Sequence, residues 1–236
     1  MSSTNYPFNK IEFDFKRERK SAEQLIRERL DPICTARGYV WTKGNWWFKD
    51  FGWCRKHCSL NLRTVGYVKQ PEVLGGGGLF LEAIHRQVIH RVDFDGPLTD
   101  RSTTMGAPIY SLDKRLSYDS GHFNSFQHLK EILPAYERAM AECVLPELER
   151  YQSEDDLLQA LLEPDWLTSV KLFASQDRRG AVVAMMRAKR NGANDAVAWA
   201  RAEVDHIKAE KPLVTSTARY QELLRTIAYL EQSSVA

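Results

Sequence analysis

The chain has 236 residues, of which 43% are hydrophobic and 27% are charged, and its formal net charge is +2. This balance excludes a largely disordered chain, because the apolar residues suffice to build a core. No run of about eighteen apolar residues occurs, so we expect no membrane-spanning helix. The start of the chain lacks a signal-peptide pattern, and four cysteines fit free thiols in a reducing compartment. These features predict a cytoplasmic globular protein.

The first half of the chain predicts a helix followed by strands. Apolar residues recur at helical spacing from about Ser21, where a capping box is expected, to Ile33. Across residues 39–94, aromatic and β-branched residues partly alternate, and residues 43–45 and 50–52 fit hairpin turns. We expect these strands to form a meandering, mainly antiparallel sheet.

Two segments of this half predict irregular structure. The glycine run at residues 75–78 lacks the Lys-Ser or Lys-Thr that completes a phosphate-binding loop, which favours a flexible connection. Residues 96–122 show little periodicity and predict a long loop. A loop of that length in a compact domain is either functional or misassigned.

Beyond Ser125 the whole chain predicts helices joined by short links, which should pack as antiparallel hairpins. The predicted fold class is therefore α+β, with an N-terminal helix and antiparallel sheet followed by an all-helical C-terminal half. We divide the chain into a sheet domain, residues 1–122, and a helical domain, residues 123–236. One continuous unit is the alternative.

The charges are distributed unevenly along the chain. Residues 1–120 have a net charge of +5, residues 121–165 of −7 and residues 166–236 of +4. An acidic segment attracts basic protein surfaces and repels nucleic acid, although it can also be an ordinary solvated surface. We expect its acids to point outward around a helix start and to be candidate partner-binding residues: Glu147, Glu149, Glu154, Asp155 and Asp156.

No metal, cofactor or catalytic site is predicted. Cys54 and Cys58 flank His57, but in an extended strand they lie roughly 13 Å apart, too far to share a zinc ion. Asp93 and Asp95 share one face of a predicted strand and leave open an enzyme with an unrecognised carboxylate site.

Residues 39–57 interleave aromatic and basic side chains. Aromatic rings beside cations bind single-stranded nucleic acid, and they also occur in sheets with one packed and one solvated face. We favour the packed sheet, and keep a nucleic-acid-binding or regulatory protein as the alternative function.

One resemblance suggests a function. The run Gly38-Tyr-Val-Trp-Thr-Lys-Gly-Asn-Trp-Trp-Phe48, preceded by a helix, resembles an uncharacterised bacterial domain family. The segments Ser153-Glu-Asp-Asp-Leu-Leu158 and Asn191-Gly-Ala-Asn-Asp-Ala196 are similar to the tails of its longer members. The resemblance implies a non-enzymatic immunity protein that neutralises a cognate bacterial toxin, with a basic toxin domain as partner and no catalytic residue.

Overall fold

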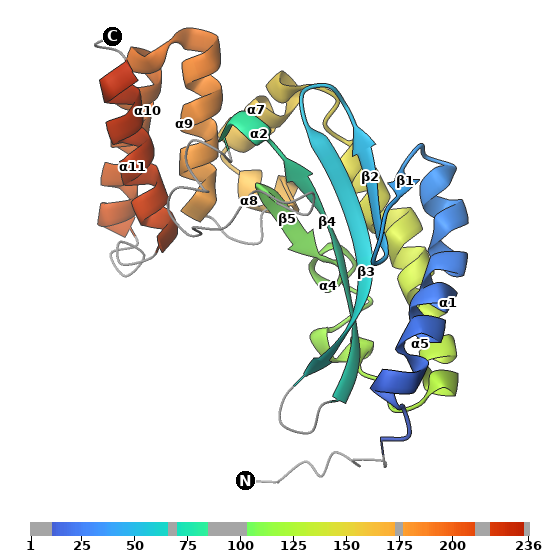
Figure 1. Ribbon diagram of the computed structural model, residues 1–236. Coiled ribbons are helices and arrows are strands. Elements are labelled where there is room, and N and C mark those ends of the chain that lie inside the picture. Colours follow the sequence, from blue (N-terminus) through green and yellow to red (C-terminus); the bar gives the residue numbers. More distant parts are fainter. Residues whose placement is uncertain (1–10, 66–69, 85–102, 173–176, 211–217, 234–236) are drawn as a thin grey trace, which may run out of the picture. The chain divides into compact units, whose positions relative to one another are not determined.

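The computed structural model describes residues 11–65, 70–84, 103–172, 177–210 and 218–233 (Figure 1). Its elements in chain order are α1 (Phe15–Thr35), β1 (Val40–Trp41), β2 (Trp46–Asp50), β3 (Arg55–Val65), β4 (Gln70–Phe80), α2 (Glu82–Ile84), β5 (Met105–Pro108), α4 (Ile109–Leu112), η2 (Tyr118–Gly121), α5 (Phe126–Ala139), the π-helical turn η3 (Met140–Val144), α6 (Leu145–Glu149), α7 (Glu154–Leu162), α8 (Trp166–Ser169), α9 (Asp177–Asn191), α10 (Ala193–Glu210) and α11 (Ala218–Ser233). The α+β class predicted from the sequence is confirmed.

The chain divides into two compact units, which we describe separately. The first comprises Met1–Lys49, Lys56–Gly77 and Ala107–Leu148, and the second comprises Asp50–Arg55, Gly78–Gly106 and Glu149–Ala236. This division differs from the predicted domains, residues 1–122 and 123–236. The difference arises because α5 and η3 pack on α1, although the sequence groups them with the later helices.

The sheet is a meander in which the five strands of the described chain follow one another in the order β1 to β5. β1 pairs antiparallel with β2, placing Val40 opposite Phe48 and Trp41 opposite Trp47. The predicted turn between them is confirmed. It contains two residues with positive φ, Gly44 at 70° and Asn45 at 53°, as tight hairpin turns require.

The glycine run is not a flexible connection, as the sequence suggested, but the interior of β4. A Cβ atom on Gly75 would lie 2.6 Å from the carbonyl oxygen of Ser59, and one on Gly76 would overlap the carbonyl of Ala107. On Gly77 it would lie 2.9 Å from a methyl carbon of Val144. The glycines therefore allow close packing on both neighbouring segments and on the helical layer.

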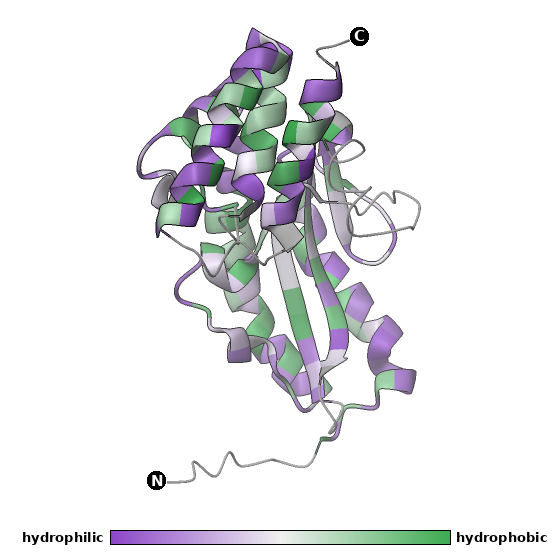
Figure 2. Ribbon diagram, turned by 90° about the vertical axis from the view of Figure 1, so that its left-hand side faces the viewer, coloured by the Kyte–Doolittle hydropathy of each residue, from purple (hydrophilic) through white to green (hydrophobic). Residues whose placement is uncertain are grey.

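Helix α1 covers the sheet together with α5, and both lie on the same side of it in Figure 1. Its buried residues are spaced four apart and form one stripe: Ala22, Ile26, Leu30 and Cys34. The remainder of α1 is mostly hydrophilic (Figure 2). The predicted capping box at Ser21 is wrong, because the helix begins earlier, with the Asp14 carboxylate accepting hydrogen bonds from the amides of Lys16 and Arg17.

The predicted loop at residues 96–122 is also wrong for the part that the structure describes. It contains β5, α4 and η2. These elements are short, and the segment carries two glycines and a proline within residues 103–122, which left no readable periodicity. The strand predicted at residues 88–94 lies outside the described residues.

The second unit is dominated by α9, α10 and α11, which pack against one another. Gly192, with a φ of 89°, separates α9 from α10. The guanidinium of Arg178 donates to both carboxylate oxygens of the fully buried Glu222, at 3.0 and 2.8 Å. Among the described helices, none combines the length and apolarity needed to cross a membrane.

Candidate binding pocket on helix α1

The first unit contains a pocket of about 570 Å³ between α1 and the β1–β2 turn. Helix α1 contributes Glu23, Gln24, Arg27, Glu28, Asp31 and Pro32 to its lining. Strand β1 contributes Trp41, and the turn contributes Gly44 and Asn45. Residues four apart share one face of a helix, so Glu23, Arg27 and Asp31 form one row, with Gln24 and Glu28 beside it.

Hydrogen bonds hold the two walls of this α1 pocket in place. The side-chain amide of the buried Asn45 donates to the carbonyl oxygen of Glu23 at 3.1 Å, which joins the turn to the helix. The indole N–H of the buried Trp47 donates to Asp31 Oδ1 at 2.8 Å, which fixes that carboxylate. The pocket is therefore built from ordered groups.

The aromatic wall of the α1 pocket is Trp41, which is half-buried. The guanidinium of Arg27 lies 3.7 Å from the centre of its ring. Within the described chain Arg27 forms no ion pair, although Glu23 and Asp31 lie one helical turn away on either side. The indole N–H of Trp41 is buried and finds no hydrogen-bond acceptor among the described residues.

The carboxylates of the α1 pocket are only partly neutralised. The lining contains three carboxylates, those of Glu23, Glu28 and Asp31, and one guanidinium, that of Arg27, so its formal net charge is −2. Glu23 pairs with Arg19 at 2.8 Å. Glu28 accepts a hydrogen bond from Gln24, and neither Glu28 nor Asp31 has a cationic partner among the described residues. Two negative charges thus remain available in a concave, aromatic-walled site.

The acidic residues chosen from the sequence are arranged differently. Glu147 is only 7% exposed, which corrects the expectation that it points outward, because α6 turns this residue toward the interior. Glu149 is half-buried at the end of the same helix. In the second unit, Glu154 pairs with Lys189, and Asp155 with Arg190 at 3.2 Å.

Asp156 has a local structural role. Its carboxylate accepts hydrogen bonds from the amides of Gln152, at 3.1 Å, and Ser153, at 3.0 Å, while the Ser153 hydroxyl accepts from the Asp156 amide. This is a capping box at the start of α7. We call Glu154, Asp155 and Asp156 the α7 acidic turn. Its carboxylates are all bound by groups of the second unit.

The aromatic and basic residues of segment 39–57 are only partly packed, because three of them are buried and most of the others are half-buried. Tyr39, Trp47 and Lys56 are at most 1% exposed. These three side chains are therefore unavailable as a platform for nucleic-acid bases. The two carboxylates considered for an enzyme, Asp93 and Asp95, lie outside the described residues.

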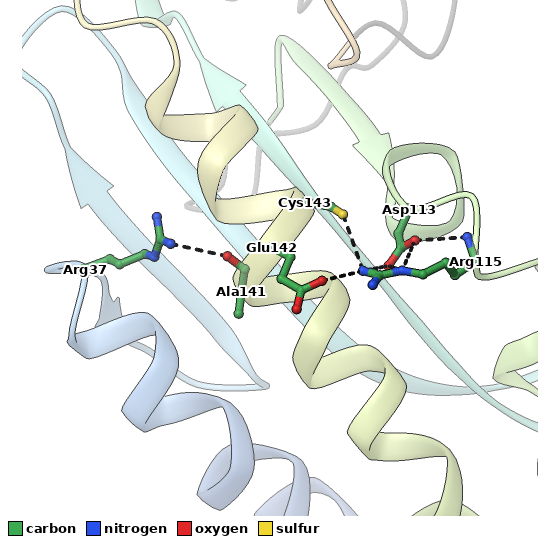
Figure 3. Close-up of polar contacts among 6 residues, drawn as sticks. All are labelled: Arg37, Asp113, Arg115, Ala141, Glu142 and Cys143. Atoms are coloured by element: carbon green, nitrogen blue, oxygen red, sulfur yellow. Dashed lines mark hydrogen bonds and ion pairs between the residues drawn. The ribbon is translucent and has the colours of Figure 1, made fainter.

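A polar cluster surrounds Arg115 in the first unit (Figure 3). Its guanidinium donates to both carboxylate oxygens of Asp113 and reaches Glu142 at 2.8 Å. The thiol of Cys143 lies 3.9 Å from the same guanidinium, and burial raises its pKa, so the neutral thiol prevails. The cluster links the segment after α4 to η3 and offers no activated nucleophile.

A second cluster joins β3, β4 and η2 and lies close enough to α5 for the charge of Glu72 to act on Tyr136. Arg63 pairs with the buried Glu72 at 2.7 Å and donates to the hydroxyl of Tyr118 at 3.3 Å. Burial, and secondarily the charge of Glu72, raises the pKa of Tyr136 to about 12. Tyr136 is therefore a poor proton donor or acceptor at neutral pH.

Among the described residues, no group of three or more His, Cys, Asp or Glu side chains is placed to hold a metal ion. Cys58 instead contacts Cys34, with the two sulfur atoms 3.7 Å apart in the core.

The sequence carries one signal of the α1 pocket. Carboxylates at positions 23, 28 and 31 precede a hairpin carrying Trp41, but which of them lacks a counter-charge depends on three-dimensional packing. No family model matches the chain, and no curated protein or solved structure matches it either. The resemblance to a bacterial domain family therefore rests on its short motifs alone.

Proposed function

We propose that this protein is a non-enzymatic protein-binding module whose α1 pocket receives basic side chains of a partner protein. The observation that carries this proposal is the pair of carboxylates, Glu28 and Asp31, that lacks a cation of its own beside Trp41. A cationic group entering a concave site gains from both the carboxylates and the ring.

The most specific form of this proposal is an immunity protein that neutralises a basic bacterial toxin domain. The motif resemblance supports this form. The charge of the α1 pocket is also complementary to such a partner, and complementary charges raise the association rate.

The binding function is tested with a blocked (Lys-Arg)₃ peptide, titrated calorimetrically against the full chain. The double variant Glu28→Gln/Asp31→Asn removes both charges and keeps an acceptor for the Trp47 indole. We expect it to bind about tenfold more weakly, since charge-assisted hydrogen bonds are lost. The matched control is Glu154→Gln/Asp155→Asn, which removes two charges from the α7 acidic turn and should change affinity less than about twofold.

Equal weakening in both double variants would contradict the proposal, because it would mean that only the total charge matters. The immunity role has its own test, in which the chain is co-expressed with the toxin domain encoded by a neighbouring gene. Wild-type protein should restore growth, and Glu28→Gln/Asp31→Asn should restore it less well. Full rescue by the double variant would remove the α1 pocket from toxin neutralisation.

A further inference from the structure

The aromatic wall of the α1 pocket is already occupied by a cation from the same chain. Arg27 lies on the ring of Trp41 at 3.7 Å. Its position on the helix places Glu23 four residues before it and Asp31 four residues after it, at the spacing of helical ion pairs. The guanidinium nevertheless forms no ion pair with described residues. The ring face is therefore the preferred location for this group.

The geometry of a guanidinium explains this preference. The group is planar and weakly hydrated, and it stacks on an aromatic face while its edge remains free to donate hydrogen bonds. An ammonium is a compact, strongly hydrated point charge that gains less from stacking. A ring that lines the same pocket as two carboxylates without a cationic partner, as Trp41 does with Glu28 and Asp31, suits the first group better than the second.

We infer, on the basis of the binding function proposed above, that the α1 pocket recognises arginine and that Arg27 holds the arginine position until a partner binds. The partner's arginine displaces Arg27 from Trp41 and donates to Glu28 and Asp31. Arg27 thus acts as an internal competitor for the ring face, which weakens ligands that stack on Trp41 more than ligands held by the carboxylates alone.

The experiment compares blocked hexa-arginine and hexa-lysine peptides on the full chain and its variants. Wild-type protein should bind hexa-arginine about fivefold more tightly than hexa-lysine. Arg27→Gln removes the competitor, so its preference for hexa-arginine should rise by a further factor of about three. The matched control is Arg29→Gln, which makes the same charge change on α1 outside the pocket, where Arg29 pairs with Glu137 at 3.6 Å.

A second variant examines the ring directly. Trp41→Leu should abolish the preference for arginine while retaining the binding of hexa-lysine through the carboxylates. The indole N–H resonance of Trp41, identified by its absence in Trp41→Leu, should shift on addition of hexa-arginine and much less with hexa-lysine. A thermal melt of each variant establishes that it is folded, and Trp41→Thr, which keeps strand propensity without an aromatic ring, replaces Trp41→Leu if the latter is not.

Different results would overturn arginine recognition and the underlying binding function. If both peptides bind equally well through Glu28 and Asp31, and Arg27→Gln behaves like Arg29→Gln, arginine recognition is overturned and the binding function stands. If neutralising Glu28 and Asp31 affects neither peptide, the binding function itself is overturned.

Discussion

The α1 pocket and the α7 acidic turn each contain three carboxylates, yet they use them differently. At α7, Glu154 and Asp155 are paired with Lys189 and Arg190 of α9, and Asp156 caps its own helix. At α1, two carboxylates have no cation among the described residues and lie beside an aromatic ring. Local density of acidic residues along the chain thus does not indicate which carboxylates lack a counter-charge in the fold.

What distinguishes the two regions is the location of the counter-charge. A carboxylate that is neutralised by its own fold contributes to stability, and one that is not contributes to the field that a partner encounters. The following predictions test this distinction, in order of decreasing effect.

The largest effect is expected where a carboxylate is fully committed to the fold. Glu222 is completely buried and bound by Arg178 through two hydrogen bonds. Arg178→Met should lower the free energy of unfolding by about 3 kcal/mol, because a buried charge loses its partner. Chemical denaturation measures this change, and a loss below about 1 kcal/mol would show that the pair is not structural.

Reversing the α7 acidic turn should destabilise the second unit. Glu154→Lys/Asp155→Lys/Asp156→Lys removes the capping carboxylate and places cations beside Lys189 and Arg190. We expect a loss of about 2 kcal/mol, in contrast to the near-neutral effect that outward-pointing acids would give. A thermal melt that coincides with wild type would show that the acids are solvated after all.

A paired carboxylate of the first unit should make the free energy of unfolding depend on pH. Hydrogen bonds from Arg115 hold the pKa of Asp113 below its ordinary value. The stability this provides is present above the unfolded-state pKa and is lost as the pH falls through the folded-state pKa. Asp113→Asn should therefore cost about 1 kcal/mol near neutral pH, and the difference from wild type should shrink in acid. A pH-independent difference in denaturation experiments would contradict this.

The smallest effect is expected when the cations that pair with the α7 acidic turn are removed. Lys189→Gln/Arg190→Gln leaves Glu154 and Asp155 without their cations, so the α7 acidic turn should begin to attract a basic peptide. We expect (Lys-Arg)₃ to associate about twofold faster at low salt, and the gain to vanish at high salt. An unchanged rate would mean that Lys189 and Arg190 do not mask these acids.

The elements that the sequence predicted well are those defined by local pattern. The four-residue spacing of α1 and the Gly44–Asn45 turn depend on neighbours along the chain. The glycine run was misread because its function depends on Ser59 and Ala107, which approach it only in the folded sheet.

The same limit applies to the site. Glu154 meets a lysine 35 residues away, and Arg27 meets a ring 14 residues away. Neither contact follows from a regular spacing of residues along the sequence. Charge counting therefore selected the α7 acidic turn and overlooked the α1 pocket.

The glycines of β4 also bear on how the sheet finds its alignment. Strand register is set by which side chains face the core, and a stretch without side chains resists slippage poorly. The alignment must then come from flanking anchors, such as the bridge between Glu72 and His122 and the hydrogen bond from the Phe123 amide to the Pro71 carbonyl at 3.1 Å. Both anchors join positions about fifty residues apart, so closing them costs substantial loop entropy. We therefore expect this strand to dock late, after α5 has brought its preceding segment into place.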